Sequence, residues 1–481
     1  MISYSAAKAV QSVGINDEHS FLGSALDFMV YVFTLLFVVC DFFLGFTDSQ
    51  NAIVQLQFMS IEILSIVFFA LDRKLYSIHK FVMLYMLVFE GYAPLQQYRL
   101  GTNLWGVVLN TDELYLYSNL LVFLFLVVFE ISYRLKRQRR IGPRCSPLAH
   151  IDVTSGVLVA FIILDVITVG YLAVTGQLIG KVSDEGGATY DTIRDALKIA
   201  VQMTCITTLF VYVLARRNAA VSATRGAQRL FQVAATISVC LVFFPFWGSM
   251  SRFLLFAGYI MLIVLLCPTP KYPSILLLLM LLGFVFVFPA FNFFKTHDFS
   301  DIAQFELSSG NFNHIDFDAH QCFMITIDYV SSRGLSLGMN LLSAILCFVP
   351  RTIWPGKWQP SGRIMFETYG ASWTNVSCPI YAEFYFAFGV VGLLALTILL
   401  ALAIRYVEES YERWDLFGQG ICIILIGMTI YIMRGAMLPT FAYTFSVVIA
   451  FALCYLIAFI PRSLALVRSE QSKQKKMSGA L

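Results

Sequence analysis

The sequence predicts an all-α, polytopic membrane protein, and its composition and its recurring apolar segments support this prediction. Of 481 residues, 58% are hydrophobic and only 13% are charged, and the mean hydropathy is +0.75. A soluble domain carries about 25% charged residues, so this chain could not cover its surface with groups that water solvates well. The chain shows no fixed-period repeat and no matching halves of the kind that many transporters have.

Twelve apolar segments have about the 17–25 residues that a membrane helix needs. They cover residues 21–45, 52–71, 80–96, 115–134, 152–174, 195–215, 229–247, 252–268, 273–294, 379–404, 418–434 and 437–461. The first segment lacks a basic flank and a small-residue cleavage site, which favours an uncleaved helix over a signal peptide. Glu90 and Pro94 interrupt the third segment.

Basic residues between these segments predict the orientation. The stretches 134–140, 215–229 and 462–476 are basic, and they fall on one side if all twelve segments cross. Other basic residues on that side are Arg73, Lys74, Lys80 and Lys271. The positive-inside rule places this side, with both termini, in the cytoplasm. The net charge is only +3, and the basic residues are clustered in loops instead of forming one basic surface. No nucleic-acid partner is therefore expected.

The segment 295–378 is then one large external loop between the ninth and tenth helices. Within it, residues 339–349 are apolar but too few to span, which favours an interfacial or re-entrant piece. Loops this long are usually functional or disordered, and the aromatic content argues against disorder. The expected regions are helices one to nine in 1–294, a loop with short interfacial helices in 295–378, helices ten to twelve in 379–461, and a basic cytoplasmic tail in 462–481.

Five cations are predicted on the external side, where the positive-inside rule expects few. They are Arg252, Arg351, Lys357, Arg363 and Arg434. Guanidinium groups bind phosphate through two hydrogen bonds, so several of them around one cavity would suit a diphosphate on a lipid carrier. The alternative is anchoring, in which such side chains reach lipid phosphates while tryptophans lie in the interface.

The external loop also offers candidate general bases. His314 and His320 are candidates to accept a proton from a sugar hydroxyl. They belong to the run HIDFDAH, which holds two histidines and two aspartates, but its spacing fits no standard metal site. We therefore predict neither a metal nor a cofactor.

Ten cysteines are scattered through the chain, without a CxxC pattern, and most are expected to be packing residues. Cys322 and Cys378 lie on the oxidising side and are able to form a disulfide if they are close enough. The sequence does not fix that distance.

Glu383 and Tyr381 begin the tenth helix directly after the cationic loop. We expect Glu383 to pair with Arg351 or Arg434, or to touch a substrate, and Tyr381 to be a substrate contact. The alternative for Glu383 is an interfacial carboxylate stabilised by the helix dipole.

These residues carry a resemblance to a known family. The late large loop, the string VPRTIWPGK and the string IYAEFYFAFGVVGLLAL resemble the Wzy-type O-antigen polymerases. Members carry an Ala-Glu-x5-Gly pattern, matched here by Ala382, Glu383 and Gly389, and an R-x10-G pattern, matched by Arg351 and Gly362. The layout agrees over most of the chain, and the motifs agree over about forty residues.

The resemblance implies a multi-spanning, GT-C-like glycosyltransferase that polymerises undecaprenyl-diphosphate-linked oligosaccharide repeat units at the periplasmic face of the bacterial inner membrane. Arg351 then stands at the motif arginine and Glu383 at the motif glutamate. Arg252 and Arg434 match only as arginines at corresponding helix ends. The implied partners are the lipid-linked oligosaccharide, membrane lipids and a chain-length regulator protein, and the transfer needs no metal because arginines neutralise the leaving diphosphate.

Two alternatives remain. An O-antigen ligase shares the multi-helix body and the late loop. A flippase or transporter of lipid-linked glycans would instead line its pathway with Asp27, Glu62 and Asp165.

Overall fold

The computed structural model describes the chain in several stretches. These are residues 21–46, 50–72, 74, 76–108, 110–135, 151–178, 192–247, 250–267, 273–283, 287–296, 301, 303, 312–371, 376–411 and 415–478. Within them the regular elements are helices, and eight of these are long and apolar enough to cross a membrane. This confirms the prediction of an all-α polytopic membrane protein.

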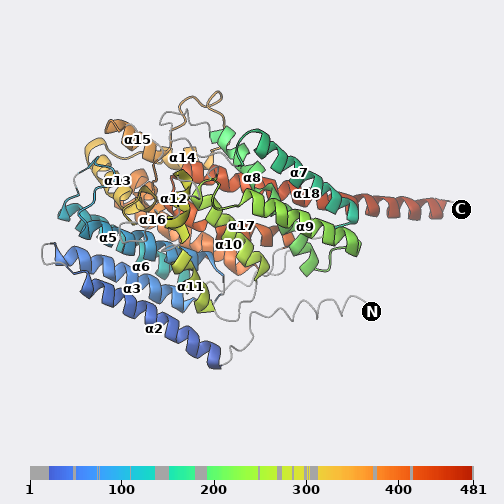
Figure 1. Ribbon diagram of the computed structural model, residues 1–481. Coiled ribbons are helices and arrows are strands. Elements are labelled where there is room, and N and C mark those ends of the chain that lie inside the picture. Colours follow the sequence, from blue (N-terminus) through green and yellow to red (C-terminus); the bar gives the residue numbers. More distant parts are fainter. Residues whose placement is uncertain are drawn as a thin grey trace.

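The eight helices coincide with eight of the twelve predicted segments. They are α2 (Phe21–Leu44), α3 (Ala52–Leu71), α6 (Asp112–Arg134), α7 (Ser155–Val174), α8 (Thr192–Arg217), α16 (Ile380–Ser410), α17 (Leu416–Arg434) and α18 (Met437–Ser478). The helix α18 continues through the predicted basic tail as far as Ser478, and Figure 1 shows its red end projecting beyond the rest of the molecule.

The other four predicted segments are helical over most of their described residues, but none is a single α-helix of sufficient length and hydropathy. They are α4 (Ile78–Tyr85) with η1 (Met86–Tyr92) and α5 (Ala93–Arg99), then α9 (Arg225–Val242), α10 (Arg252–Leu266), and α11 (Pro273–Leu282) with α12 (Phe288–Thr296). In the first of these, Pro94 has no N–H to donate, and the preceding turns widen into the π-helix η1. A total of twelve crossings therefore remains a prediction.

The late loop is folded where it is described. It contains η6 (Ile315–Phe317), α13 (Ala319–Arg333), α14 (Met339–Ile345) and α15 (Ser361–Thr368). The short α14 agrees with the predicted non-spanning piece. The first half of α13 is buried and packs against α6 and α16, so it lies deeper than the interfacial position expected from the sequence. We call the end of the helix bundle against which residues 312–371 pack the loop end (Figure 1).

Basic side chains gather at the opposite end of the bundle. There Lys74 forms an ion pair with Glu408 at 2.6 Å, and Arg405 donates to the backbone carbonyl of Tyr133 at 3.1 Å. Arg217 donates to the carbonyl of Leu265 in the same region. Basic segments that are far apart in sequence thus share one end, as the positive-inside argument requires. Arg73, residues 136–140 and Lys271 lie outside the described residues.

A buried histidine organises the charges at this opposite end. The Nε2 atom of His79 lies 2.6 Å from the carboxylate of Glu130, and its Nδ1 atom lies 3.4 Å from Asp72. Its ring stacks on Tyr133, with 4.2 Å between the ring centroids. Burial by itself lowers the pKa of His79, but the two neighbouring carboxylates outweigh burial and raise that pKa above its ordinary value of 6.5.

This raised pKa predicts a pH-dependent stability. The imidazolium of His79 contributes its full stabilisation below the unfolded-state pKa of about 6.5, and that contribution is lost as the pH rises through the higher folded-state pKa. We expect the melting temperature of the detergent-solubilised protein to fall as the pH rises above about 6.5, and His79→Gln to flatten this fall. An equally steep fall in His79→Gln would contradict the prediction.

Candidate functional site

Arg434, the last residue of α17, is partly buried at the loop end, with 14% of its side chain exposed. Its guanidinium donates to Asp318 at 2.9 Å and to the backbone carbonyls of Ile315 and Asp316 at 2.8 and 2.9 Å. It also lies over the ring of Phe253, with 4.5 Å to the ring centroid. Arg434 therefore fixes the start of the late loop onto the helix bundle.

Arg252, the first residue of α10, is a buried cation with unused donors. Its Nη1 atom donates to the carbonyls of Pro245 and Trp247 at 2.8 and 3.3 Å. Its Nε and Nη2 atoms have no hydrogen-bond partner within the part of the chain that the structure describes, although the residue is only 4% exposed. A buried donor without a partner costs about 1–3 kcal/mol, so an anion that accepts from these two atoms would be stabilised there.

Asp316 connects the two arginines to a histidine. Its carboxylate attracts the guanidinium groups of both Arg252 and Arg434. The Nδ1 atom of His314 accepts a hydrogen bond from the backbone N–H of Asp316 at 3.2 Å and also lies 3.2 Å from the Asp316 carboxylate. The His314 side chain is 48% exposed. We call Arg252, His314, Asp316 and Arg434 the arginine–histidine cluster. It brings together three of the residues predicted from the sequence.

The other predicted cations lie apart from this cluster. Arg351 donates to the carbonyls of Lys357 and Trp358 at 2.5 and 3.1 Å, and to the side chain of Gln359 at 3.0 Å. Lys357 donates to carbonyls at the C-terminal end of α14, and Arg363 pairs with Glu367 one turn along α15. The described contacts of Arg351 thus close its own loop, and the expected convergence with Arg252 and Arg434 is not seen.

Glu383 does not form the pairing with Arg351 or Arg434 that the sequence suggested. Its buried carboxylate accepts hydrogen bonds from the side chains of Asn340 at 2.7 Å and Ser361 at 2.6 Å, and from the backbone N–H of Met437 at 2.9 Å. These donors belong to α14, α15 and the first residue of α18. The carboxylate therefore ties the late loop to the helix bundle, and no cation approaches it closely enough for an ion pair among the described residues.

The backbone geometry explains why glycine is needed at both motif positions, Gly362 and Gly389. A Cβ atom on Gly362 would lie 2.5 Å from the carbonyl oxygen of Val376, so a side chain there would collide with the backbone. Gly389 has φ +64° at a break inside α16, a conformation that L-residues rarely adopt. The glycines of the R-x10-G and Ala-Glu-x5-Gly patterns therefore allow a close backbone contact within the loop and a break in α16.

His320 and Tyr381 lie in the core. His320 contacts Ser118 through Nε2 and Glu90 through Nδ1, both at 3.0 Å. Tyr381 donates to the same Glu90, as does Tyr85. All are buried, so neither predicted residue reaches solvent. Sequence reasoning missed this network because Glu90 and His320 stand 230 positions apart.

Cys322 and Cys378 are buried free thiols, so the disulfide considered from the sequence is not formed. Among the described residues no group of three or more His, Cys, Asp or Glu side chains is arranged to hold a metal ion.

No family model, curated protein sequence or solved structure matches this chain. The helices and the site define it as a polytopic helical membrane protein with a buried arginine, Arg252, in a polar cluster at one end of its bundle.

Proposed function

We propose that this protein is a membrane glycosyltransferase of the O-antigen polymerase type. It joins undecaprenyl-diphosphate-linked oligosaccharide repeat units at the periplasmic face of the bacterial inner membrane, with both termini in the cytoplasm. The resemblance of residues 349–389 supports this family. The observation that carries the proposal is the arginine–histidine cluster, and above all the unpartnered Nε and Nη2 atoms of Arg252.

These two atoms suit a lipid-linked diphosphate. The Nε–H and Nη2–H groups lie on one edge of the guanidinium plane, which is the edge that accepts a phosphate through two parallel hydrogen bonds. Arg434 lies nearby, but its guanidinium is paired with Asp318, so the free donors are those of Arg252, and burial strengthens their interaction with an anion. Arg252 stabilises the charge that develops on the diphosphate as it leaves.

The transfer itself needs one base. A hydroxyl oxygen at the non-reducing end of the acceptor forms a bond to the anomeric carbon of the donor, and the bond from that carbon to the diphosphate breaks. The diphosphate leaves on its lipid, and the hydroxyl proton passes to His314, whose imidazole Asp316 orients. In this scheme Glu383 and Arg351 hold the loop in place instead of contacting the reacting atoms.

A reconstituted reaction tests this proposal. Protein in lipid nanodiscs is given undecaprenyl-diphosphate-linked repeat units from the host strain, in the presence of EDTA, and the products are separated by length. We expect long polymer from the wild type and a rate about 10²–10⁴-fold lower from His314→Ala. Glu409→Gln, an exposed change at the opposite end of the bundle, serves as the control.

The same measurements separate the alternatives. A ligase would transfer glycan to a lipid A–core acceptor without making longer chains, and a flippase would move the lipid without forming any glycosidic bond. In cells, loss of a polymerase leaves surface chains of one repeat unit, whereas loss of a ligase leaves none attached. Absence of polymer from folded wild-type protein would contradict the proposal.

A further inference from the structure

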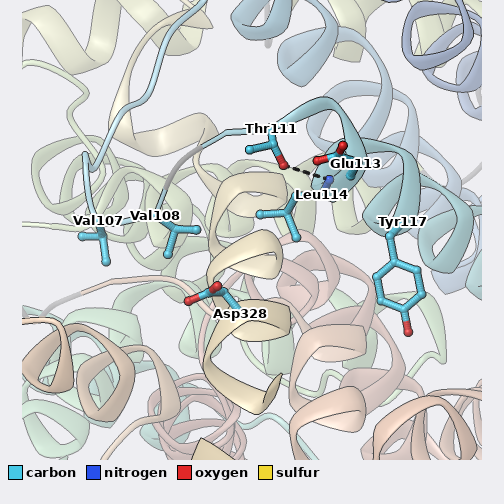
Figure 2. A pocket seen from close by; sticks show the side chains of 7 residues that line it. All are labelled: Val107, Val108, Thr111, Glu113, Leu114, Tyr117 and Asp328. Carbon is cyan, nitrogen blue, oxygen red and sulfur yellow. Dashed lines mark hydrogen bonds between the residues drawn. The ribbon is translucent and has the colours of Figure 1, made fainter. Parts of the chain in front are cut away.

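A groove of about 590 Å³ lies at the loop end, between the start of α6 and the helix α13 (Figure 2). It is lined by Val107, Val108, Thr111, Glu113, Leu114, Tyr117 and Asp328. None of these residues belongs to the arginine–histidine cluster. Its volume is in the range of small-molecule sites, and the groove opens to the surface.

The polar groups of the groove are hydrogen-bond acceptors of fixed position. Figure 2 shows the Asp328 side chain directed toward the space between Val108 and Leu114. One oxygen of Asp328 accepts a hydrogen bond at 2.5 Å from the hydroxyl of Tyr369, the residue that follows α15, and this contact helps to position the carboxylate. Glu113 supplies a second carboxylate at the rim, in the first turn of α6.

Besides Thr111, whose hydroxyl accepts from the backbone N–H of Leu114, the remaining described lining residues are apolar or aromatic, and none is a cation. Tyr117 is 39% exposed and contributes an aromatic ring to the lining. Val107, Val108 and Leu114 are partly buried and form apolar walls. Carboxylates that accept hydroxyl hydrogens, next to an aromatic ring that packs on C–H groups, suit a sugar ring. The absence of Lys, Arg and His from the lining disfavours a phosphate.

A buried hydrogen-bond network also fixes the two helices that form the walls of the groove. Ser118 and His320 join α6 to α13 at 3.0 Å, one turn along α6 from Leu114, and Glu90 holds the other ring nitrogen of His320. The two helices that form the walls are thus fixed by a buried network. A preformed site loses less conformational entropy when it binds a ligand.

We propose that this groove is a glycan-binding site, in which Asp328 and Glu113 accept hydrogen bonds from the hydroxyls of a neutral sugar that packs on Tyr117. Its assignment to the acceptor repeat unit rests on the proposed function. The parts of the ligand are separated by charge: the arginine–histidine cluster holds the diphosphate, and the acidic groove holds a sugar of the acceptor repeat unit other than the one that carries the attacking hydroxyl.

The test measures binding without catalysis. The probe is the neutral, lipid-free repeat-unit oligosaccharide released by mild acid from the surface glycan of the host strain. Its binding to protein in nanodiscs is followed by saturation-transfer NMR. We expect binding by the wild type and by Arg252→Met, and binding weaker by about tenfold or more in Asp328→Asn and in Tyr117→Ala. Glu409→Gln is the control and should bind like the wild type.

Each outcome has a defined meaning. Equal binding by the wild type, Asp328→Asn and Tyr117→Ala would overturn the groove as a glycan site, and so would loss of binding in Arg252→Met alone. Melting temperatures near that of the wild type show that the variants are folded. Oligosaccharide binding that depends on Asp328, in a protein that makes no polymer, would support the groove and overturn the polymerase proposal.

Discussion

Replacement of Arg252 by methionine is expected to abolish polymer synthesis and to leave the protein folded. The change removes the two unpartnered nitrogens that the proposed diphosphate would occupy, which should lower the rate on the order of 10²–10³-fold or more. It also removes a buried charge, and this relief offsets the lost hydrogen bonds to Pro245 and Trp247. The melting temperature should therefore change by only a few degrees.

The experiment compares polymer length and melting temperature for three variants. Arg252→Met tests the whole interaction, and Arg252→Lys keeps the charge while losing the planar fork, so it should retain only part of the activity. Arg225→Met changes an exposed arginine that begins α9 at the opposite end, and it should behave like the wild type. Full-length polymer from a folded Arg252→Met protein would rule out the assignment of the cluster as the diphosphate site.

Glu383→Ala is expected to lower the free energy of unfolding. The substitution leaves the side chains of Asn340 and Ser361 and the backbone N–H of Met437 without their acceptor in a buried site. Each unsatisfied buried donor costs about 1–3 kcal/mol, so the total loss should reach roughly 3 kcal/mol or more. Because three elements meet at this carboxylate, the loop should detach from the bundle before the rest unfolds.

Two readouts distinguish this structural role from a catalytic one. Thermal unfolding should begin at a lower temperature in Glu383→Ala, and limited proteolysis should cut the late loop first. Glu409→Ala, an exposed change near the other end of the same helix, should alter neither measurement. A Glu383→Ala protein that melts and resists protease like the wild type, but makes no polymer, would restore Glu383 to a role in the chemistry.

The sequence predicted the helices well because a long apolar run has few alternatives in a membrane. Each of the twelve predicted segments contains a helix, and eight of these helices meet the requirements for a span. The short segment 339–349 was also recognised, because α14 has too few residues to cross. Length and hydropathy are local properties, and they are read directly from the chain.

The partners of individual side chains were predicted less completely, because they depend on how distant segments of the chain pack together. The cation-rich stretch around Arg351 suggested an external anion site, but Arg351 and Lys357 bind carbonyls of their own loop. Glu383 found neutral donors from three distant elements instead of a cation. The groove at Asp328 had no sequence signal, since its walls come from segments more than two hundred residues apart.

The break in α16 gives the loop end a mechanical consequence. At Phe388 and Gly389 the helix geometry is lost, and the backbone N–H of Ser336 donates to the carbonyl of Phe386 at 2.9 Å just before the break. The first two turns of α16 are thereby joined to the late loop, and Tyr381 in the same turns packs on Phe125 of α6. Movement of the late loop would therefore be transmitted to α6 through these two turns, and Gly389 marks where the rest of α16 changes direction, because it has no side chain to oppose the left-handed backbone.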